Sequence, residues 1–502
     1  MKPVIGRRRL ALAVTVFLIL QWSVLYLPHL RTAPSWYGDE GLALTAGLKL
    51  AHGVAAHGSF KNTFWNPYAP YQPLYEWIVG TASWISGGDI IGGRLFNAIL
   101  ALALAVLIAF GGRRIMSAMA AFGSAVLFLG FEQSVIHFRW IFTHNLVALG
   151  FCITFLALSG RRTRRSGWIA GMGLAIGAMA LPLAVYGLAA ALAVSWNRPR
   201  SWLPIAIPFA IATGASMATG AMLHGWEYVW SDLQATAGFY SHASRENSGG
   251  LLTHFWRFFT QDGFHLLALG LTLSALRGRS RCLAAGTLLI AILLLQNRAN
   301  LTVFYYQAIV ITPLLCLGIG AGLSRWIEWA SEREILSKPV CRLLKVSPLL
   351  LGIAFAIGMV PKSLSGKIPT RIDFWTTQSI PEVEAAATWV NRHTGPHDLV
   401  ICHQNIAWLL HCRTADYLQS TTWQGIPTWP FRVPLRKDQF LYAPDLSEAR
   451  FAVVADIDKR WTFAQPGVEE ATKEILQGKW PLVWMGEHYA VFQNPASVAR
   501  TE

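Results

Sequence analysis

The sequence predicts an α-helical protein that crosses a membrane many times and ends in a small α/β domain. Of its 502 residues, 53% are hydrophobic and 14% are charged, whereas a soluble domain carries about 25% charged residues. The excess positive charge is confined to the apolar part, because residues 1–361 hold 28 Lys and Arg against 12 Asp and Glu, and residues 362–502 hold 14 against 15. The basic residues form short clusters between apolar runs. This pattern is typical of multi-pass membrane proteins and excludes a nucleic-acid binder, which gathers its basic residues on one solvated face.

The apolar runs predict the membrane spans. The first run, Leu10–Leu27, follows three consecutive arginines and is not followed by a small-residue cleavage site, so we expect an uncleaved span with a cytoplasmic N-terminus. If every basic cluster is cytoplasmic, the run Trp168–Trp196 must cross twice, with a break near Leu181–Pro182, and residues 1–361 form about eleven spans. The remaining runs are Arg94–Phe110, Ile115–Phe131, Phe138–Leu158, Trp202–Leu223, Gly263–Leu276, Leu283–Leu295, Leu301–Leu323 and Ser347–Val360.

Two outer loops are expected, at residues 29–91 and 223–262. Within the first, residues 70–86 are apolar but shorter than the ~20 residues that a span needs, so we expect an amphipathic helix on the outer membrane surface. The second carries His, Asp, Glu and Arg side chains among aromatic residues. A loop of this length either covers a functional site or forms plain surface, and the sequence leaves both open.

From residue 362 the composition is that of a soluble protein, and alternating elements predict a small α/β domain outside the cytoplasm, residues 362–502. This domain has no glycine-rich phosphate-binding loop, so we expect no cofactor on it. Helices are predicted at Pro381–His393 and Gly467–Gln477, and strands at Asp398–Cys402, Arg450–Ala455, Leu482–Trp484 and Tyr489–Gln493.

Two cysteines, Cys402 and Cys412, lie in this exported domain, where a disulfide can persist. Their neighbours His403 and His411 complete a pattern that also resembles a metal site. Structural zinc sites use tighter pairs of ligands, so the sequence favours a disulfide over zinc while leaving both open.

An acidic pair, Asp39 and Glu40, stands in the first outer loop, directly before a segment with helical spacing. Acidic side chains stabilise helix N-termini, which explains the pair without any function. However, Trp36 and Tyr37 give the pair aromatic flanks, and the loop is expected beside the membrane surface, where a lipid headgroup meets a water-soluble acceptor. A carboxylate there can act as a general base on a hydroxyl or an amine.

At these residues the sequence resembles the GT-C superfamily of integral-membrane glycosyltransferases, in particular the bacterial relatives of protein O-mannosyltransferase and of lipid A aminoarabinose transferase. The resemblance extends over about the first 360 residues and rests on four segments that follow one another in order. They are the acidic pair with a helix that ends at Gly53, the segment Gln72–Trp77, the segment Arg94–Ala98, and the tyrosine-rich Phe304–Tyr306 before a helix with Pro313.

The resemblance implies a GT-C-like fold and the transfer of a sugar, with inversion, from a polyprenyl-phosphate donor to a lipid, glycan or protein acceptor. The reaction is expected at the outer face of the inner membrane, with Asp39 as the base and Glu40 beside it. The departing phosphate requires positive charge and hydrogen-bond donors, for which the candidates are Arg94, Arg139, Arg298, Lys61, Tyr305 and Tyr306. Snorkelling to lipid headgroups explains the basic side chains equally well, and an interfacial aromatic belt explains the tyrosines.

The sequence departs from the family pattern at two places. Tyr71 stands where some relatives have a basic residue, and the acid that often follows the outer arginine is replaced by His144 or Asn145, with Glu132 as a substitute. We therefore expect Glu132, His144 and Tyr75 in the substrate loop. The departures leave a divalent metal site open without predicting one.

A transporter or flippase of lipid-linked sugars is the alternative function, and a polymerase that uses lipid-pyrophosphate donors is a third class. Transporters commonly show internal repeats and charged residues at mid-membrane depth. This sequence shows no repeat and few ionisable residues in its apolar runs. It therefore favours a transferase whose partners are the bilayer, a polyprenyl-phosphate-sugar donor and an acceptor, with a C-terminal domain in the periplasm.

Overall fold

The computed structural model divides the chain into two compact units. The helical unit comprises Met1–Pro34, Arg94–Ala215 and Tyr240–Pro369, and the mixed unit comprises Ser35–Gly93, Ser216–Phe239 and Thr370–Glu502. Structure is described for residues 2–36, 40–41, 43–44, 48, 74–159, 163–224, 226, 229–230, 253–296, 305–335, 337–368, 380–428, 437, 440, 442–465 and 467–498. The mixed unit thus groups most of the first predicted outer loop with the C-terminal residues.

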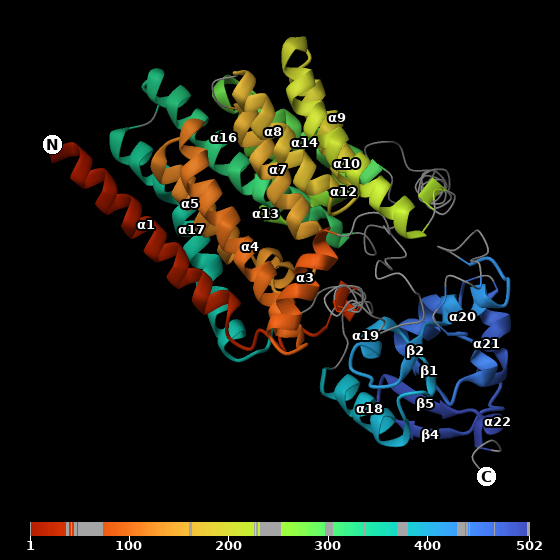
Figure 1. Ribbon diagram of the computed structural model, residues 1–502. Coiled ribbons are helices and arrows are strands. Elements are labelled where there is room, and N and C mark those ends of the chain that lie inside the picture. The colour runs from red at the N-terminus through yellow and green to blue at the C-terminus, as the bar shows by residue number, and fades with distance from the viewer. Residues whose placement is uncertain are drawn as a thin grey trace. The chain divides into compact units, whose positions relative to one another are not determined.

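The helical unit is a bundle of α-helices (Figure 1). The first residues of α4 and the last residues of α10 belong to the mixed unit. The helices are α1 (Lys2–Tyr26), α4 (Ile90–Gly111), α5 (Ala118–Gly130), α6 (Glu132–His137), α7 (His144–Ser159), α8 (Arg164–Ala178), α9 (Ala184–Val194), α10 (Trp202–His224), α12 (Thr253–Thr260), α13 (Gly263–Ser274), α14 (Arg281–Gln296), α16 (Thr312–Glu332) and α17 (Lys338–Leu364).

The predicted break in the run Trp168–Trp196 is confirmed. α8 ends at Ala178 and α9 begins at Ala184, so Pro182 lies between the helices and interrupts neither. The chain is a multi-pass membrane protein, but the count of about eleven spans stays a prediction because α5, α7, α9 and α13 have only 10–17 residues. Six described segments are long and apolar enough to cross a membrane: Arg9–Tyr26, Ile90–Arg114, Trp202–Thr219, Gly278–Leu295, Gln307–Glu332 and Pro339–Leu364.

Two aromatic side chains of α1 fix that helix against its neighbours. Trp22 donates from Nε1 to the carbonyl oxygen of Ala98 in α4 at 2.6 Å. Tyr26 donates from its hydroxyl to the carbonyl oxygen of Leu129 in α5 at 3.2 Å. Because polar groups in an apolar environment are costly when unpaired, these bonds favour one position of α1 along α4 and α5.

Glycines allow α5 and α17 to touch backbone to backbone. A Cβ atom placed on Gly352 of α17 would lie 2.5 Å from the amide nitrogen of Leu127, and one on Gly130 of α5 would lie 2.7 Å from the carbonyl oxygen of Gly352. Real Cβ atoms do not approach so closely, so larger side chains do not fit at these positions. Small residues have this role at many membrane helix interfaces, where close van der Waals packing drives association.

The mixed unit is built on a five-stranded sheet with the strand order β2-β1-β3-β5-β4 (Figure 1). β2, β1 and β3 are parallel, and β5 and β4 continue the sheet antiparallel. Its hydrophobic core includes Ala452 and Val454 of β3. The strands are β1 (Leu399–Ile401), β2 (Arg413–Ala415), β3 (Phe451–Ala455), β4 (Leu482–Met485) and β5 (Tyr489–Gln493), and the helices are α3 (Leu74–Ile85), α18 (Ile380–His393), α19 (Gln404–Ala407), α20 (Tyr417–Trp423), α21 (Val468–Leu476) and α22 (Pro495–Val498).

The four strands and two helices predicted for the C-terminal residues are confirmed as β1, β3, β4, β5, α18 and α21. The edge strand β2 is missing from the prediction, because its three residues are too few to show an alternation of apolar and polar side chains. The helix predicted within residues 70–86 is confirmed as α3. One part of its surface is buried, with Tyr75 and Val79, and the exposed part carries the apolar side chains of Trp77 and Trp84. Its contact with a membrane surface stays a prediction.

We expect Gly352→Leu to destabilise the helical unit, because the added side chain would force α5 and α17 apart. Overpacking of this kind costs about 1–3 kcal/mol, so the thermal unfolding midpoint of the purified protein in detergent should fall. The matched control is Gly358→Leu on the same helix, where a Cβ atom meets nothing within 4 Å. Equal midpoints for the two variants would contradict the backbone contact.

Candidate active site

Several predicted site residues lie outside the described residues, namely Asp39, Lys61 and Arg298. Tyr305 and Tyr306 begin the 3₁₀ helix that precedes α16, and the structure describes their backbone. The roles predicted for these five residues stay predictions.

Glu40 lies inside the mixed unit. Its side chain is only 1% exposed, and the backbone is helical at 40, 41, 43, 44 and 48, which confirms the helix predicted after the acidic pair. A carboxylate with so little exposure offers no open face to a soluble acceptor. The catalytic role predicted for Glu40 stays a prediction.

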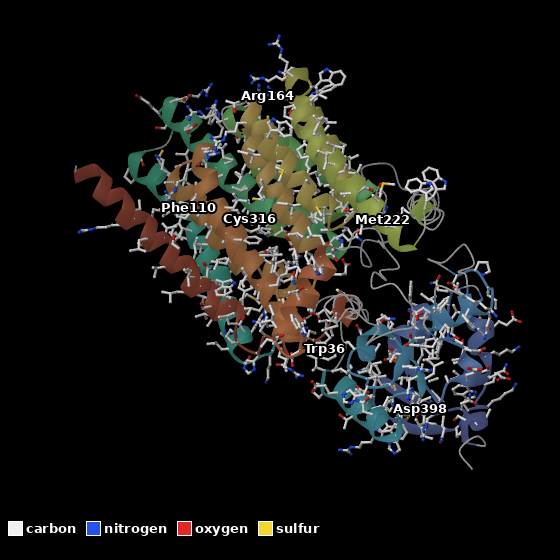
Figure 2. All side chains as sticks on the ribbon, viewed as in Figure 1. Trp36, Phe110, Arg164, Met222, Cys316 and Asp398 are labelled. Carbon is white, nitrogen blue, oxygen red and sulfur yellow. The ribbon has the colours of Figure 1, made fainter. Side chains whose placement is uncertain are left out.

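The residues on either side of Asp39 in the sequence contact α19 and the residue after it. The ring of Trp36 (labelled in Figure 2) lies 5.2 Å from the ring of Trp408, measured between centroids. The amide of Gly41 donates to Oδ1 of Asn405 at 3.3 Å. Sequence analysis missed Asn405 and Trp408, because no local pattern marks a contact between residues 364 positions apart.

Arg139 is fully buried and holds the segment that follows α1. Its Nε donates to the carbonyl oxygen of Ala33 at 2.9 Å and its Nη1 to that of Leu25 at 2.8 Å, while Nη2 donates to the carbonyl oxygen of Pro28. A guanidinium carries five N–H donors in a planar fork. One side chain thus fixes the path of the chain as it leaves the first helix.

Arg94, which lies on α4, binds the same segment that follows α1. It is fully buried, and its Nη1 donates to the carbonyl oxygens of Leu30 and Pro34 at 3.0 Å each. Arg94 and Arg139 were both predicted to bind the donor phosphate. The contacts described here support a positioning role for both, because these guanidinium groups donate to backbone carbonyls; direct phosphate binding stays a prediction.

A polar network joins α4, α6 and α7. Nδ2 of Asn145 donates to Oδ1 of Asn97 at 2.8 Å and to the carbonyl oxygen of His137 at 2.9 Å. Nδ1 of His137 lies 2.7 Å from the carbonyl oxygen of Gln133. Burial lowers the pKa of His137 to about 4, so the ring is neutral at neutral pH. Sequence analysis missed His137, whose only signal is its place in a polar turn between two apolar runs.

The structure does not bring the other predicted residues into one unit. Tyr75 belongs to the mixed unit, whereas Glu132 and His144 belong to the helical unit. Glu132 pairs with Lys362 at 3.6 Å, with both side chains partly exposed. His144 is mostly buried and stacks on Phe142, with a centroid distance of 4.3 Å. Their common place in a substrate loop stays a prediction.

Buried carboxyl groups follow two parallel strands of the mixed unit. Asp416 comes after β2 and accepts hydrogen bonds from the amide of Gln419 at 2.7 Å and from Nε2 of Gln404 at 3.2 Å. Asp458 comes after β3 and accepts from the amide of Ala455 at 2.9 Å. Burial raises the pKa of Asp416 to about 6 and that of Asp458 to about 7. This edge, where parallel strands end, is the side on which α/β sheets bind ligands.

Cys402 and Cys412 are buried free thiols in the structure, so the disulfide that the sequence leaves open is not formed here. His403 accepts a hydrogen bond from the amide of Asn405 through Nδ1 at 3.2 Å and thereby caps α19. Across the described ranges of the chain, no three His, Cys, Asp or Glu side chains gather in a group that could hold a metal ion.

We expect Arg139→Lys to behave like Arg139→Ala, because a single ammonium group does not reproduce the planar fork that serves three carbonyl groups. Each buried carbonyl left unpaired costs about 1–3 kcal/mol, so both variants should unfold at lower temperature and open residues 25–34 to protease. Arg164→Ala, at the exposed start of α8, is the control. A normal midpoint with weakened donor binding would instead identify Arg139 as a phosphate ligand.

We expect the mixed unit to lose stability as the pH rises from about 4 to about 7. Over this window the folded state binds more protons than the unfolded state, because burial raises the pKa of Asp416 and Asp458. The side chain of the variant Asp458→Asn stays neutral at every pH. The thermal midpoint of the variant minus that of the wild type should therefore be larger at pH 8 than at pH 5, by about 3 °C or more. Parallel pH curves for the two proteins would show that Asp458 titrates normally.

No protein-family model and no curated protein matches this sequence. Two solved structures match along almost the whole of both chains. The structure of ArnT from Cupriavidus metallidurans bound to undecaprenyl phosphate is 13% identical, covers 98% of this chain and 99% of its own, and has a TM-score of 0.59. The apo state of the same protein is 13% identical, covers 99% of each chain and has a TM-score of 0.61. ArnT is a GT-C glycosyltransferase, and the chain described here therefore has the GT-C fold that its sequence motifs resemble.

Proposed function

We propose that this protein is an inverting glycosyltransferase that moves a sugar from a polyprenyl-phosphate donor to an acceptor at the outer face of the inner membrane. The observation that carries the proposal is the likeness to ArnT, which extends over both the membrane helices and the C-terminal residues and includes a structure bound to undecaprenyl phosphate. The positions of the basic clusters in the sequence support an outer location for the first loop and a periplasmic C-terminal domain.

Asp39 is the proposed general base. In a single displacement, the oxygen or nitrogen of the acceptor attacks the anomeric carbon of the sugar, and the bond between that carbon and the phosphate oxygen breaks. The proton of the acceptor passes to the carboxylate of Asp39, and the polyprenyl phosphate leaves with the bond electrons. General base catalysis of this kind contributes about 10²–10⁴-fold to the rate. Because only one displacement occurs, the configuration at the sugar carbon inverts.

Two buried arginines support this chemistry through the segment that precedes Asp39 in the sequence. Arg94 and Arg139 fix residues 25–34, and the chain reaches Asp39 five residues later. Two positive charges that are buried and held rigid also favour a nearby anion more strongly than charges in water do. In this proposal Arg94 and Arg139 position the segment that leads to Asp39, and Arg298 or Lys61 contacts the phosphate itself.

We expect Asp39→Asn to abolish sugar transfer without lowering stability. In a strain that lacks the gene, the unused donor should accumulate, and mass spectrometry of extracted polyprenyl-phosphate lipids would identify its sugar. Complementation with the wild type should remove the accumulated lipid, and complementation with Asp39→Asn should not. Glu474→Gln, which alters an exposed acid paired with Lys479, is the matched control and should complement fully.

The same lipid then separates a transferase from a flippase. Purified protein in nanodiscs should convert the accumulated donor to free polyprenyl phosphate when acceptor lipids or glycans from the cell envelope are present, whereas a flippase would leave the sugar–phosphate bond intact. No change of any polyprenyl-phosphate sugar in the deletion strain would refute the proposed function. Full complementation by Asp39→Asn would remove only Asp39 from its role.

A further inference from the structure

Residues 36–41, which include the acidic pair and are called the acidic loop below, approach the C-terminal part of the chain so closely at Gly41 that no residue larger than glycine fits there. A Cβ atom placed on Gly41 would lie 2.4 Å from the carbonyl oxygen of Gln404 and 2.5 Å from Cα of Asn405. The same position is bound through its amide to Oδ1 of Asn405, and Asn405 is only 1% exposed. The backbone after the acidic pair is therefore seated directly on α19.

A second contact lies on the other side of Asp39 in the sequence. Trp36 is 1% exposed and Trp408 is 7% exposed, and their rings pack at a tilt of 45°. Trp408 directly follows α19, so residues 404–408 contact the loop at two points that flank Asp39. A pair of buried aromatic rings contributes about 0.5–1.5 kcal/mol beyond the burial of its area.

α19 is itself held at the edge of the sheet. His403, two residues after β1, caps its N-terminus. Gln404 donates to Asp416, and Asp416 caps the N-terminus of α20 through the amide of Gln419. The two bonds of Asp416 join buried groups, where an unpaired polar atom is costly. Residues 403 and 404, which begin the segment that contacts the loop, are thus held by hydrogen bonds at the ends of two parallel strands.

We propose that Asn405 and Trp408 form a clamp that positions the Asp39 loop for catalysis, so that the C-terminal domain is a working part of the active site. Asn405 is a positioning residue, because it acts on Asp39 through the backbone of Gly41. The inference rests on the proposed function for its catalytic consequence, while the clamp itself is a physical contact that can be measured in the resting protein. The carboxylate of Asp39 and the acceptor must be held within a few tenths of an ångström of the reactive arrangement, so a looser loop lowers turnover.

The test uses the full-length protein in nanodiscs and backbone hydrogen–deuterium exchange. Asn405→Leu keeps the size of the side chain but removes the acceptor, so amide exchange in residues 36–48 should quicken at least tenfold. Asn405→Asp retains an oxygen acceptor and should restore slow exchange. Gly41→Ala should also quicken this exchange, because the added Cβ atom collides with α19 and pushes the two segments apart. The control is Gly395→Ala, whose Cβ atom meets only an ordinary contact at 3.8 Å and should leave the exchange unchanged.

The matched control for Asn405 is Asn494→Leu. Asn494 is equally a buried asparagine of the mixed unit, and its Nδ2 donates to the carbonyl oxygens of Ser447 and Ala449 at 2.9 Å each. Its substitution should lower the unfolding midpoint yet leave exchange in residues 36–48 unchanged. A role of Asn405 in stability alone would give the same result as Asn494→Leu and would overturn the clamp.

Activity gives the second readout, in the deletion strain described above. Asn405→Leu and Gly41→Ala should leave the donor lipid accumulated, at least tenfold above the wild type, and Asn405→Asp should restore its removal. Faster exchange with normal donor levels would overturn the positioning role. If the deletion itself leaves donor lipids unchanged, the proposed function is wrong and the catalytic consequence of the clamp is wrong with it. If amide exchange in residues 36–48 is unchanged in Asn405→Leu, the clamp is wrong whatever the activity of the protein.

Discussion

The fold depends on how the chain leaves its first helix. Beyond Tyr26 the chain continues in turns that alternate between exposed and buried positions, and Leu30, Ala33 and Pro34 are buried. Buried carbonyl groups need hydrogen-bond donors from elsewhere in the protein. Arg94 and Arg139 supply the missing donors from α4 and from the turn before α7. The segment that these two side chains hold precedes Asp39 and Glu40 in the sequence.

The acidic loop joins parts of the chain that are far apart in sequence. Residues 35–93 and 370–502 belong to one compact unit, and Trp36 and Gly41 contact residues 404–408 within it. A sheet whose parallel strands end on this side presents short helices and polar side chains at its edge. Here α19 follows β1, and Asn405 and Trp408 contact Gly41 and Trp36. In the proposed function, the C-terminal residues therefore support the backbone of the site and need not supply a reacting group.

Close backbone contact recurs in both units and is achieved in the same way. Gly130 and Gly352 bring α5 against α17, and Gly41 brings the acidic loop against α19. In each case a methyl group would collide with backbone atoms of the neighbouring element. Specificity of packing in this protein therefore resides partly in positions without a side chain, which hydrophobicity patterns do not reveal.

The sequence by itself determined the elements that obey a period or a charge rule. The break at Pro182, the helix α3, four of the five strands and the GT-C fold all follow from runs of apolar residues, their interruptions and a few ordered motifs. Only the tertiary structure decided which groups the buried polar side chains bind. Phosphate binding by Arg94 and Arg139 stays a prediction, and their hydrogen bonds to carbonyl groups were not expected from the sequence. Asn405 had no signal at all, because hydrogen bonds between residues 60 to 364 positions apart leave no local pattern in the chain.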